Sequence, residues 1–368
     1  MPTLRYYCLL LTDGQRPELG GSADSGFQIV ELGEVPRFAE QPDFFGPHAE
    51  EAGPAFDEAK AAFLFYGYRP ARREAGAFFG AAHAQLARAV AGMRGLGVDV
   101  LRMWPFPLRE ARELPEDPLA EDLFSVGFQE RPGGGFRAET FGLAKLDQRE
   151  VSFDFRGRDL VDEASVLCAR LVEYTLGQSG RVEHGQALSF GFDRVGFRAV
   201  EGHDAGGSLR GWHPVFVQRA LPEAVFPGVG RLEVNAFEPM SERTAPDLTD
   251  ALRRSFEQRL VVGALESPLG TPHQSTLVRA CLCAGGEQGL CGFREEPASV
   301  RDSGWTFVCA RPPPGPHEIG VGPLGALVRR LPQILKYLGL PAGSHLEWSG
   351  TDVRVDAGGA APDGDEDG

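Results

Sequence analysis

The stretch Gly292-Phe-Arg-Glu-Glu-Pro297, followed after four residues by Asp302-Ser-Gly-Trp-Thr-Phe307, organises the last part of this 368-residue chain. The second segment opens with turn chemistry, because an Asp side chain can bond to its own backbone and Gly accepts a positive φ. Its aromatic and β-branched residues then favour a strand. The proline that ends the first segment cannot donate a ladder hydrogen bond, so it ends a strand or lies at an edge. Together the two segments predict a β-hairpin.

A further strand is predicted upstream at Thr276–Cys283, closed by the hairpin turn Gly285-Gly286. With Cys291–Arg294 and Trp305–Val308 it predicts three antiparallel strands. Successive side chains of a strand alternate between two faces, so Trp305 and the phenylalanine two residues later share one face. Two interpretations follow. Both rings belong to the core, or the tryptophan is an exposed anchor for a partner.

The segments Phe293-Arg-Glu-Glu-Pro297 and Asp302-Ser-Gly-Trp-Thr-Phe307 resemble the signature of a small bacterial domain. That domain occurs among immunity proteins of polymorphic toxin systems, in the group numbered thirty-three. The likeness continues through Ile319-Gly-Val321 and the helical run to Leu338, and it ends with Ala342-Gly-Ser344 before a tryptophan. It spans a fifth to a quarter of the chain. The resemblance implies stoichiometric binding and neutralisation of a toxin effector, with no catalysis.

The chain departs from that family at Arg311-Pro-Pro-Pro-Gly-Pro316, where relatives tend to be acidic. Partner contacts that the acidic segment makes in relatives are therefore not expected here. A second and weaker likeness, from Thr140 through Phe155, is to another uncharacterised bacterial α+β domain. It bears on the fold class alone.

The predicted partner-binding patch consists of Glu295, Glu296 and Asp302 with Arg294 and Trp305. An aromatic anchor flanked by charges is typical of hot spots in protein interfaces. The alternative is a solvated turn beside a core tryptophan. The patch predicts a protein partner, a basic toxin effector, and leaves the oligomeric state open.

The charge balance of the chain narrows the classes of partner. With 52 acidic and 37 basic side chains, the formal charge is −15. A nucleic-acid binder normally has a basic footprint, and an anionic membrane attracts basic segments, so neither partner is expected. A basic protein partner suits this charge through complementary fields, and the charge also favours solubility.

No segment indicates export or membrane insertion. The apolar run Tyr6–Leu11 is shorter than the apolar region and cleavage site of a signal peptide. No stretch approaches the ~20 apolar residues that span a bilayer. We therefore expect a cytoplasmic protein whose cysteines are reduced thiols.

The chain length suggests at least two domains. Interleaved helices and hairpins predict an α+β fold, with antiparallel sheets and helices packed on one face. The N-terminal body is predicted at residues 1–265, with a further division near residues 110–122. The segment Glu266–Pro272 is the predicted linker, residues 273–355 form the C-terminal domain, and residues 356–368 form a disordered acidic tail.

Periodicity places the main elements. Residues 14–54 are expected to be mostly loop, and Pro332 should break the helical run 323–338. The predicted helices are 71–96, 162–176 and 247–262. The predicted strands are 4–12, 61–68, 98–104, 123–129, 136–146, 151–155, 187–200, 213–219, 231–237, 345–348 and 353–355.

Two patterns resemble sites for small ligands. Gly320-Val-Gly-Pro-Leu-Gly325 has the spacing of a dinucleotide-binding turn, but a Pro-rich segment precedes it where a strand is required, so it indicates a helix entry. Four cysteines could hold zinc, but they lack paired Cys-x-x-Cys knuckles, and small buried thiols are common in cores. These cysteines are Cys281, Cys283, Cys291 and Cys309.

The rival prediction is an enzyme. His203 and His213 could be metal ligands in the N-terminal body, although a Gly-Gly pair between them indicates a loop. No spacing singles out a carboxylate pair for acid–base work. The main prediction therefore includes no catalytic residue, no metal and no cofactor.

Overall fold

The protein is described from a computed structural model. It consists of two compact units, and the chain passes between them more than once. The first unit comprises Met1–Phe155, Ala164–Gln186 and Phe197–Val234, and the second comprises Arg156–Glu163, Ala187–Gly196 and Asn235–Gly368. The structure describes residues 4–19, 26–33, 35, 49–69, 75–102, 104–118, 120–177, 182–199, 231–237, 243–264, 269–281, 289–310, 318–349 and 352–356.

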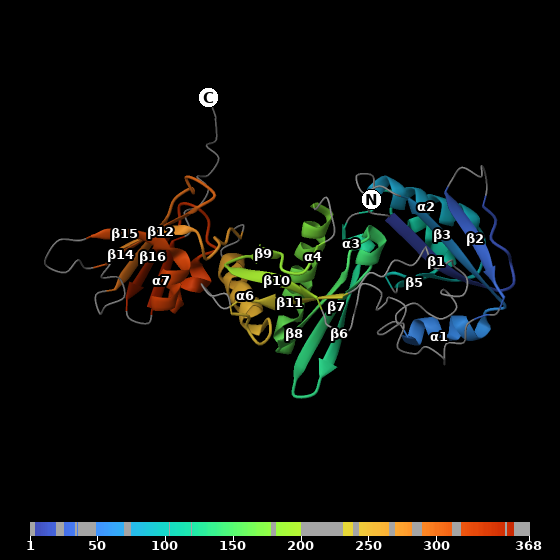
Figure 1. The fold of residues 1–368 in the computed structure, drawn as a ribbon, viewed down its shortest axis with the longest axis horizontal. Helices are drawn as coiled ribbons and strands as arrows, with labels where there is room; N and C mark the ends of the chain where they lie inside the picture. The colour runs from blue at the N-terminus through green and yellow to red at the C-terminus, as the bar shows by residue number, and fades with distance from the viewer. Residues whose placement is uncertain are drawn as a thin grey trace, which may run out of the picture. The chain divides into compact units, whose positions relative to one another are not determined.

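The predicted α+β class is confirmed, because helices are combined with sheets in which most strands run antiparallel (Figure 1). Among the described helices, none is long and apolar enough to cross a membrane. The predicted strand 213–219 and the tail 357–368 lie outside the described residues, as does the turn Gly285-Gly286.

The first sheet has the strand order β2-β3-β1-β4-β5 and is antiparallel throughout. Its central strand is buried along its whole length, because apolar side chains occupy both of its faces. Helices therefore cover both faces, with α2 on one side and α1 on the other (Figure 1). The bounds are β1 Leu4–Thr12, β2 Phe27–Leu32, α1 Ala49–Glu58, β3 Ala61–Arg69, α2 Ala75–Ala89, β4 Gly95–Asp99 and β5 Trp104–Pro107.

Three predictions for this region differ from the structure. The expected loop 14–54 contains β2 and the start of α1, whose helical signal is weakened by Pro54 inside the helix. The expected strand 98–104 is two strands, because the chain turns at Val100–Arg102 and pairs β5 back onto β4. Helix α2 is shorter than predicted, and Gly92, with a φ of 78°, follows its end.

The second sheet has the order β6-β7-β8-β11-β10-β9. The hairpin β6–β7 turns through Gly133 and Gly134, both with positive φ, as the Gly-Gly-Gly run predicted. The bounds are β6 Ser125–Arg131, β7 Gly135–Phe141, β8 Glu150–Arg156, α4 Val161–Gly177, β9 Ala187–Phe190, β10 Asp193–Ala199, β11 Arg231–Ala236 and α6 Thr249–Gly263.

The third sheet lies in the second unit and has the order β15-β12-β14-β13-β16-β17. Strands β13 and β14 form the expected antiparallel hairpin, but β12 pairs with β14 in parallel, which corrects the prediction of three antiparallel strands. The antiparallel neighbour of β12 is β15. The bounds are β12 Leu277–Cys281, β13 Leu290–Arg294, β14 Asp302–Cys309, β15 Ile319–Pro323, β16 His345–Ser349 and β17 Asp352–Asp356.

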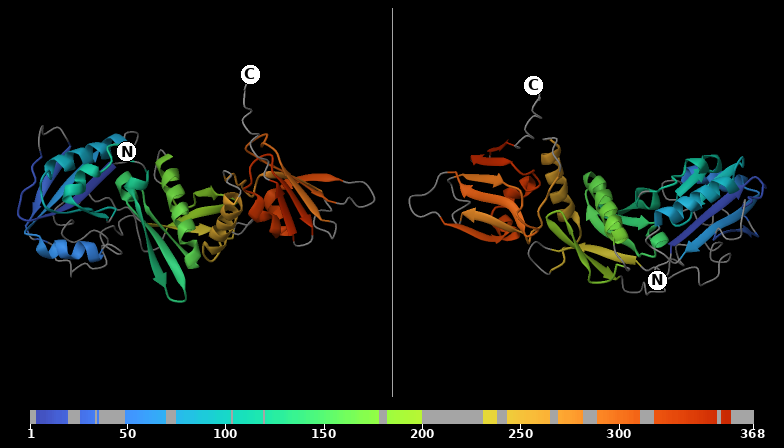
Figure 2. Two further views of the ribbon diagram at one scale, coloured as in Figure 1. Left: turned by 180° about the vertical axis from the view of Figure 1, so that it is seen from behind. Right: turned by 90° about the horizontal axis from the view of Figure 1, so that it is seen from above.

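Helices cover one face of this third sheet. Helix α7, Leu324–Arg330, is followed by the 3-10 turn η10, Pro332–Tyr337, and Pro332 divides the run as predicted. Figure 2, right, shows these helical turns between the sheet and α6. The amide of Gln258 in α6 donates to the carbonyl of Leu335 at 2.9 Å. Helix α6 thus belongs to the same unit as the C-terminal sheet, whereas the predicted boundary at Glu266–Pro272 separated them.

Candidate functional site

Trp305 lies in the core of the second unit and is 1% exposed. Its indole N–H donates to the carbonyl of Leu338 at 3.2 Å, and its ring stacks on Phe307 with centroids 5.3 Å apart. The core interpretation of this tryptophan is therefore correct. An exposed anchor at this position was the wrong alternative, because the face of β14 that carries the ring is the one that α7 and η10 cover.

Arg294 is also buried, which removes a second residue from the predicted patch. Its guanidinium donates to the carbonyls of Leu338 and Leu340, and to that of Gly270 at 2.6 Å. Burial lowers the pKa of Arg294 to about 10. The side chain thus ties three backbone segments together inside the unit, and a partner cannot reach it.

Asp302 orders the turn that leads into β14. Its carboxylate accepts the backbone N–H of Gly304 at 3.0 Å and that of Ala298 at 3.1 Å. These bonds favour the charged form and lower the pKa of Asp302. Gly304 has a φ of 73°, and a Cβ there would meet the carbonyl oxygen of Glu295, so the turn requires glycine.

Glu295 and Glu296 are exposed, as predicted for contact residues. They lie just beyond the end of β13, and a carboxylate oxygen of Glu295 is 3.9 Å from the guanidinium of Arg279. Of the five predicted patch residues, the structure therefore places two on the surface and two in the core, and the fifth holds a turn.

The strand register brings together surface residues that the sequence did not single out. A single row crosses all six strands, since each residue pairs with the next one across the sheet. All six side chains point away from the helix-covered face. We call this row the outer face; from β15 to β17 it consists of Val321, Arg279, Thr306, Phe293, His345 and Asp356.

The middle and one edge of the outer face are apolar. Phe293 is 42% exposed and stacks on His345 with ring centroids 4.6 Å apart, and Val321 is 65% exposed. Two further apolar residues on the neighbouring strands β12 and β15, Leu277 and Ile319, are also exposed. Four of the eight large exposed apolar side chains among the described residues therefore lie on this sheet, and a group of this kind is typical of an interaction surface.

A buried polar cluster in the first unit was not predicted from the sequence. The ammonium group of Lys145 pairs with the carboxylate of Asp99, and it lies 5.6 Å from the ring centre of Tyr6. Burial lowers the pKa of Lys145 and raises those of Tyr6 and of the Cys8 thiol. All four residues are 6% exposed or less, so a substrate could not reach them.

His83 borders the same cluster. One ring nitrogen lies 2.7 Å from the carbonyl of Pro115, which assigns the N–H to that nitrogen, and the ring meets Tyr6 edge-on at 5.4 Å. Burial lowers the pKa of His83. The cluster therefore acts as an internal tie between β1, β4, α2 and the turn Leu143–Leu146. Isolated polar residues within apolar runs were its only signal in the sequence.

The structure shows where the residues of the two patterns that resemble ligand sites lie. Gly320 and Gly322 lie within strand β15, so they cannot form a phosphate-binding turn between a strand and a helix. The sulfur atoms of Cys281 and Cys309 are 3.7 Å apart. Within the described residues, no group of three or more His, Cys, Asp or Glu side chains could hold a metal. Cys283, His203 and His213 lie outside the described residues.

Comparison with protein-family models, with curated proteins and with solved structures found no match for this chain. The candidate site therefore depends on the geometry of the outer face.

Proposed function

We propose that this chain is an immunity-type protein of bacterial toxin systems, which binds a basic toxin effector in the cytoplasm and neutralises it by occlusion. The observation that supports this proposal is the outer face, in which Phe293 and Val321 are exposed apolar residues, with the exposed carboxylates of Glu295 and Glu296 at the end of β13. Such a surface provides an apolar centre with a charged rim, as protein interfaces do. Binding of this kind needs no catalytic residue.

The charges on and next to this sheet favour a basic partner. Among the described residues of its strands and their immediate flanks, exposed acidic side chains outnumber the exposed arginines Arg279, Arg301 and Arg354. Complementary charge speeds association and fixes orientation, whereas burial of the apolar centre supplies most of the affinity. The exposed acids are Glu295, Glu296, Glu318, Glu347, Asp352 and Asp356.

Capture from the lysate of the cell that makes this protein tests the proposal. The tagged chain should retain one basic protein in near-equal amount at low salt and less of it at moderate salt, with mass spectrometry as the readout. Phe293→Asp should abolish retention because it places a charge at the apolar centre. Leu260→Asp is the matched control, since Leu260 is 57% exposed on α6 of the same unit and lies outside the outer face.

Neutralisation requires a second readout. The captured protein, expressed alone, should arrest growth, and coexpression of this chain should restore it. Coexpression of the Phe293→Asp variant should not, whereas the Leu260→Asp variant should. A captured protein without toxicity, or rescue that is equal for both variants, would contradict the proposal.

Reversal of two charges distinguishes an electrostatic effect on the association rate from an effect on the affinity. Replacement of Glu295 and Glu296 by Lys should slow association and flatten its dependence on salt, with a smaller effect on dissociation. Surface plasmon resonance with the captured partner measures both rates. Unchanged association would remove these two residues from the interface.

A further inference from the structure

The first unit contains a pocket of about 790 Å³ that the proposed function does not use. It lies where the end of α2, the turn into β4 and the 3-10 helix η5, Leu108–Glu113, meet. Its volume falls within the range of pockets that hold small organic ligands. Its residues all belong to the first unit, so this site and the outer face can be tested separately.

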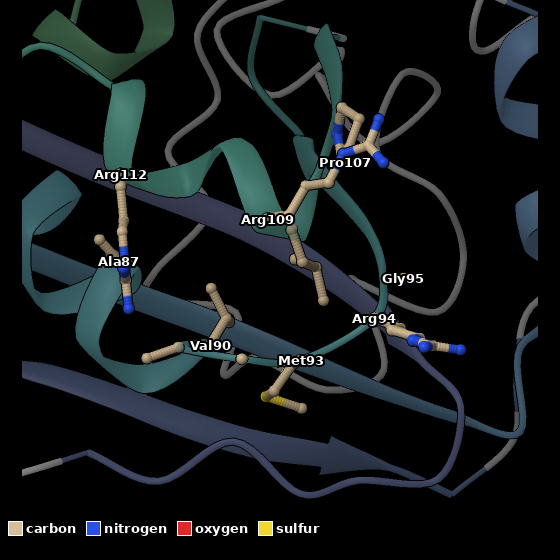
Figure 3. A pocket seen from close by; sticks show the side chains of 11 residues that line it. Ala87, Val90, Met93, Arg94, Gly95, Pro107, Arg109 and Arg112 are labelled. Carbon is tan, nitrogen blue, oxygen red and sulfur yellow. The ribbon is translucent and has the colours of Figure 1, made fainter.

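The middle of the pocket is apolar. Val90, Met93 and Leu108 are buried core residues that line it, and Ala87 and Pro107 are half-buried beside them. In Figure 3, the side chains of Val90 and Met93 lie between the labelled arginines. An apolar group placed there would be removed from water on contact with these side chains, which favours binding.

Three arginines surround this apolar middle, and no acidic residue lines the pocket. In the view of Figure 3, Arg112 lies next to Ala87, Arg94 lies on the opposite side, and Arg109 extends past Pro107. Arg109 has a long, exposed contact of 3.5 Å with Glu110. Within the described residues, Arg94 and Arg112 form no ion pair or hydrogen bond.

The helix end does not account for these cations. Carbonyls at the end of α2 favour a positive charge within the last turn. Arg88 already occupies that turn, and its guanidinium donates to the carbonyl of Ala84 at 3.1 Å. Arg94 follows the helix by several residues, and the other two arginines belong to η5. Three cations therefore line one pocket of a chain whose formal charge is −15.

We propose that this pocket binds a small organic anion with an apolar body, such as a carboxylate or a phosphate ester. A guanidinium presents paired N–H donors that match carboxylate and phosphate oxygens. The apolar body would cover Val90, Met93 and Leu108, and acidic groups would meet the arginines around them. Because the arginines lie on different sides of the pocket, an anion with acidic groups at both ends of an apolar chain fits best.

A pair of ligands with the same chain and opposite charge tests this assignment. Calorimetric titration of the full chain should show saturable one-to-one binding of decanedioate and no binding of 1,10-diaminodecane. The affinity for decanedioate should fall as salt is raised, because exposed charges are screened. Equal binding of both ligands, or no binding of decanedioate up to about 10 mM, would overturn the proposal.

Substitutions of single arginines test whether decanedioate binds in this pocket. Arg94→Gln and Arg112→Gln should each weaken decanedioate binding about tenfold, which is the loss expected for one charge-assisted hydrogen bond. Arg88→Gln is the control, since it removes the same charge from an exposed residue of α2 that does not line the pocket. An equal loss of decanedioate affinity in all three variants would show that only the net charge of the protein matters. That result would contradict a specific site in this pocket.

A pocket-filling variant keeps every arginine. Ala91 is exposed and lines the pocket, so Ala91→Trp should block decanedioate while the thermal midpoint of the protein stays unchanged. Retained affinity in this variant would show that the pocket is not where the anion binds. Circular dichroism of each variant confirms that the fold is intact.

Discussion

The pair formed by Lys145 and Asp99 should be among the most sensitive points of the first unit. Lys145 is 1% exposed and Asp99 is 6% exposed. Replacing Lys145 by Met preserves most of the volume but leaves the carboxylate buried without its cation. Asp99 would keep the backbone N–H of Arg102, at 3.2 Å, as a donor. Loss of one partner of a buried ion pair costs about 3–5 kcal/mol, so Lys145→Met should destabilise the unit by that amount.

A double variant tests whether the two charges act as a pair. Lys145→Met combined with Asp99→Asn removes both charges, and it should cost less than Lys145→Met alone because no uncompensated charge stays buried. Arg149→Met is a control, because Arg149 pairs with the exposed carboxylate of Glu183 at 3.1 Å. Its effect should stay below about 1 kcal/mol, as for surface ion pairs.

The assay must resolve the two units, because a protein with more than one unit need not unfold in a single step. Hydrogen exchange followed by mass spectrometry reports the free energy of opening for peptides of β1 and β4 separately from those of β14. The loss should appear in β1 and β4 and leave β14 unchanged. A double variant as unstable as the sum of its single variants, or a cost below about 1 kcal/mol for Lys145→Met, would refute the assignment of a coupled buried pair.

Three further predictions concern stability. Arg294→Met should destabilise the second unit by at least about 3 kcal/mol in urea unfolding, because three backbone carbonyls lose a charged donor; a cost near zero would show that water replaces the guanidinium. Trp305→Ala should cost roughly 3–5 kcal/mol and abolish the near-ultraviolet circular dichroism of the second unit, as for a large core side chain; an unchanged melting midpoint would contradict its burial. Because the pKa of His83 is lowered by burial, the unfolded state binds the extra proton first, so stability should fall as the pH drops below 6.5. His83→Gln should reduce this pH dependence, and the exposed control His184→Gln should not. Thermal midpoints measured between about pH 8 and pH 5 test this. If the midpoint of the His83→Gln variant falls with pH as steeply as that of the unchanged protein, His83 is not the group responsible.

Local patterns in the sequence determined the α+β class and most of the elements. The spacing of apolar residues located α4 and α6, the Gly-Gly-Gly run located the hairpin β6–β7, and Pro332 divided the last helical run. These features depend on residues close together in the chain, and periodicity and backbone stereochemistry act at that range. The alternation along β14 likewise placed Trp305 and Phe307 on one face of the strand.

Only the tertiary structure decided which face of that strand is covered. An alternating strand has two faces, and its sequence alone does not tell which one the helices cover. Residues 323–337 bury the face that carries Trp305, and the phenylalanine of the same signature, Phe293, is left on the outer face. For the same reason Arg294 was expected on the surface but lies inside.

The sequence alone likewise did not predict which distant strands pair or which distant segments lie close together. The parallel pairing of β12 with β14 and the pairing of β13 with β16 join segments separated by tens of residues, and such register has no local signal. The three arginines of the pocket come from two segments, the connection after α2 and the 3-10 helix η5, that only packing brings together. The sequence thus determined most of the elements and their amphipathic faces, and the tertiary structure decided which faces meet, because burial is a property of the whole assembly of elements.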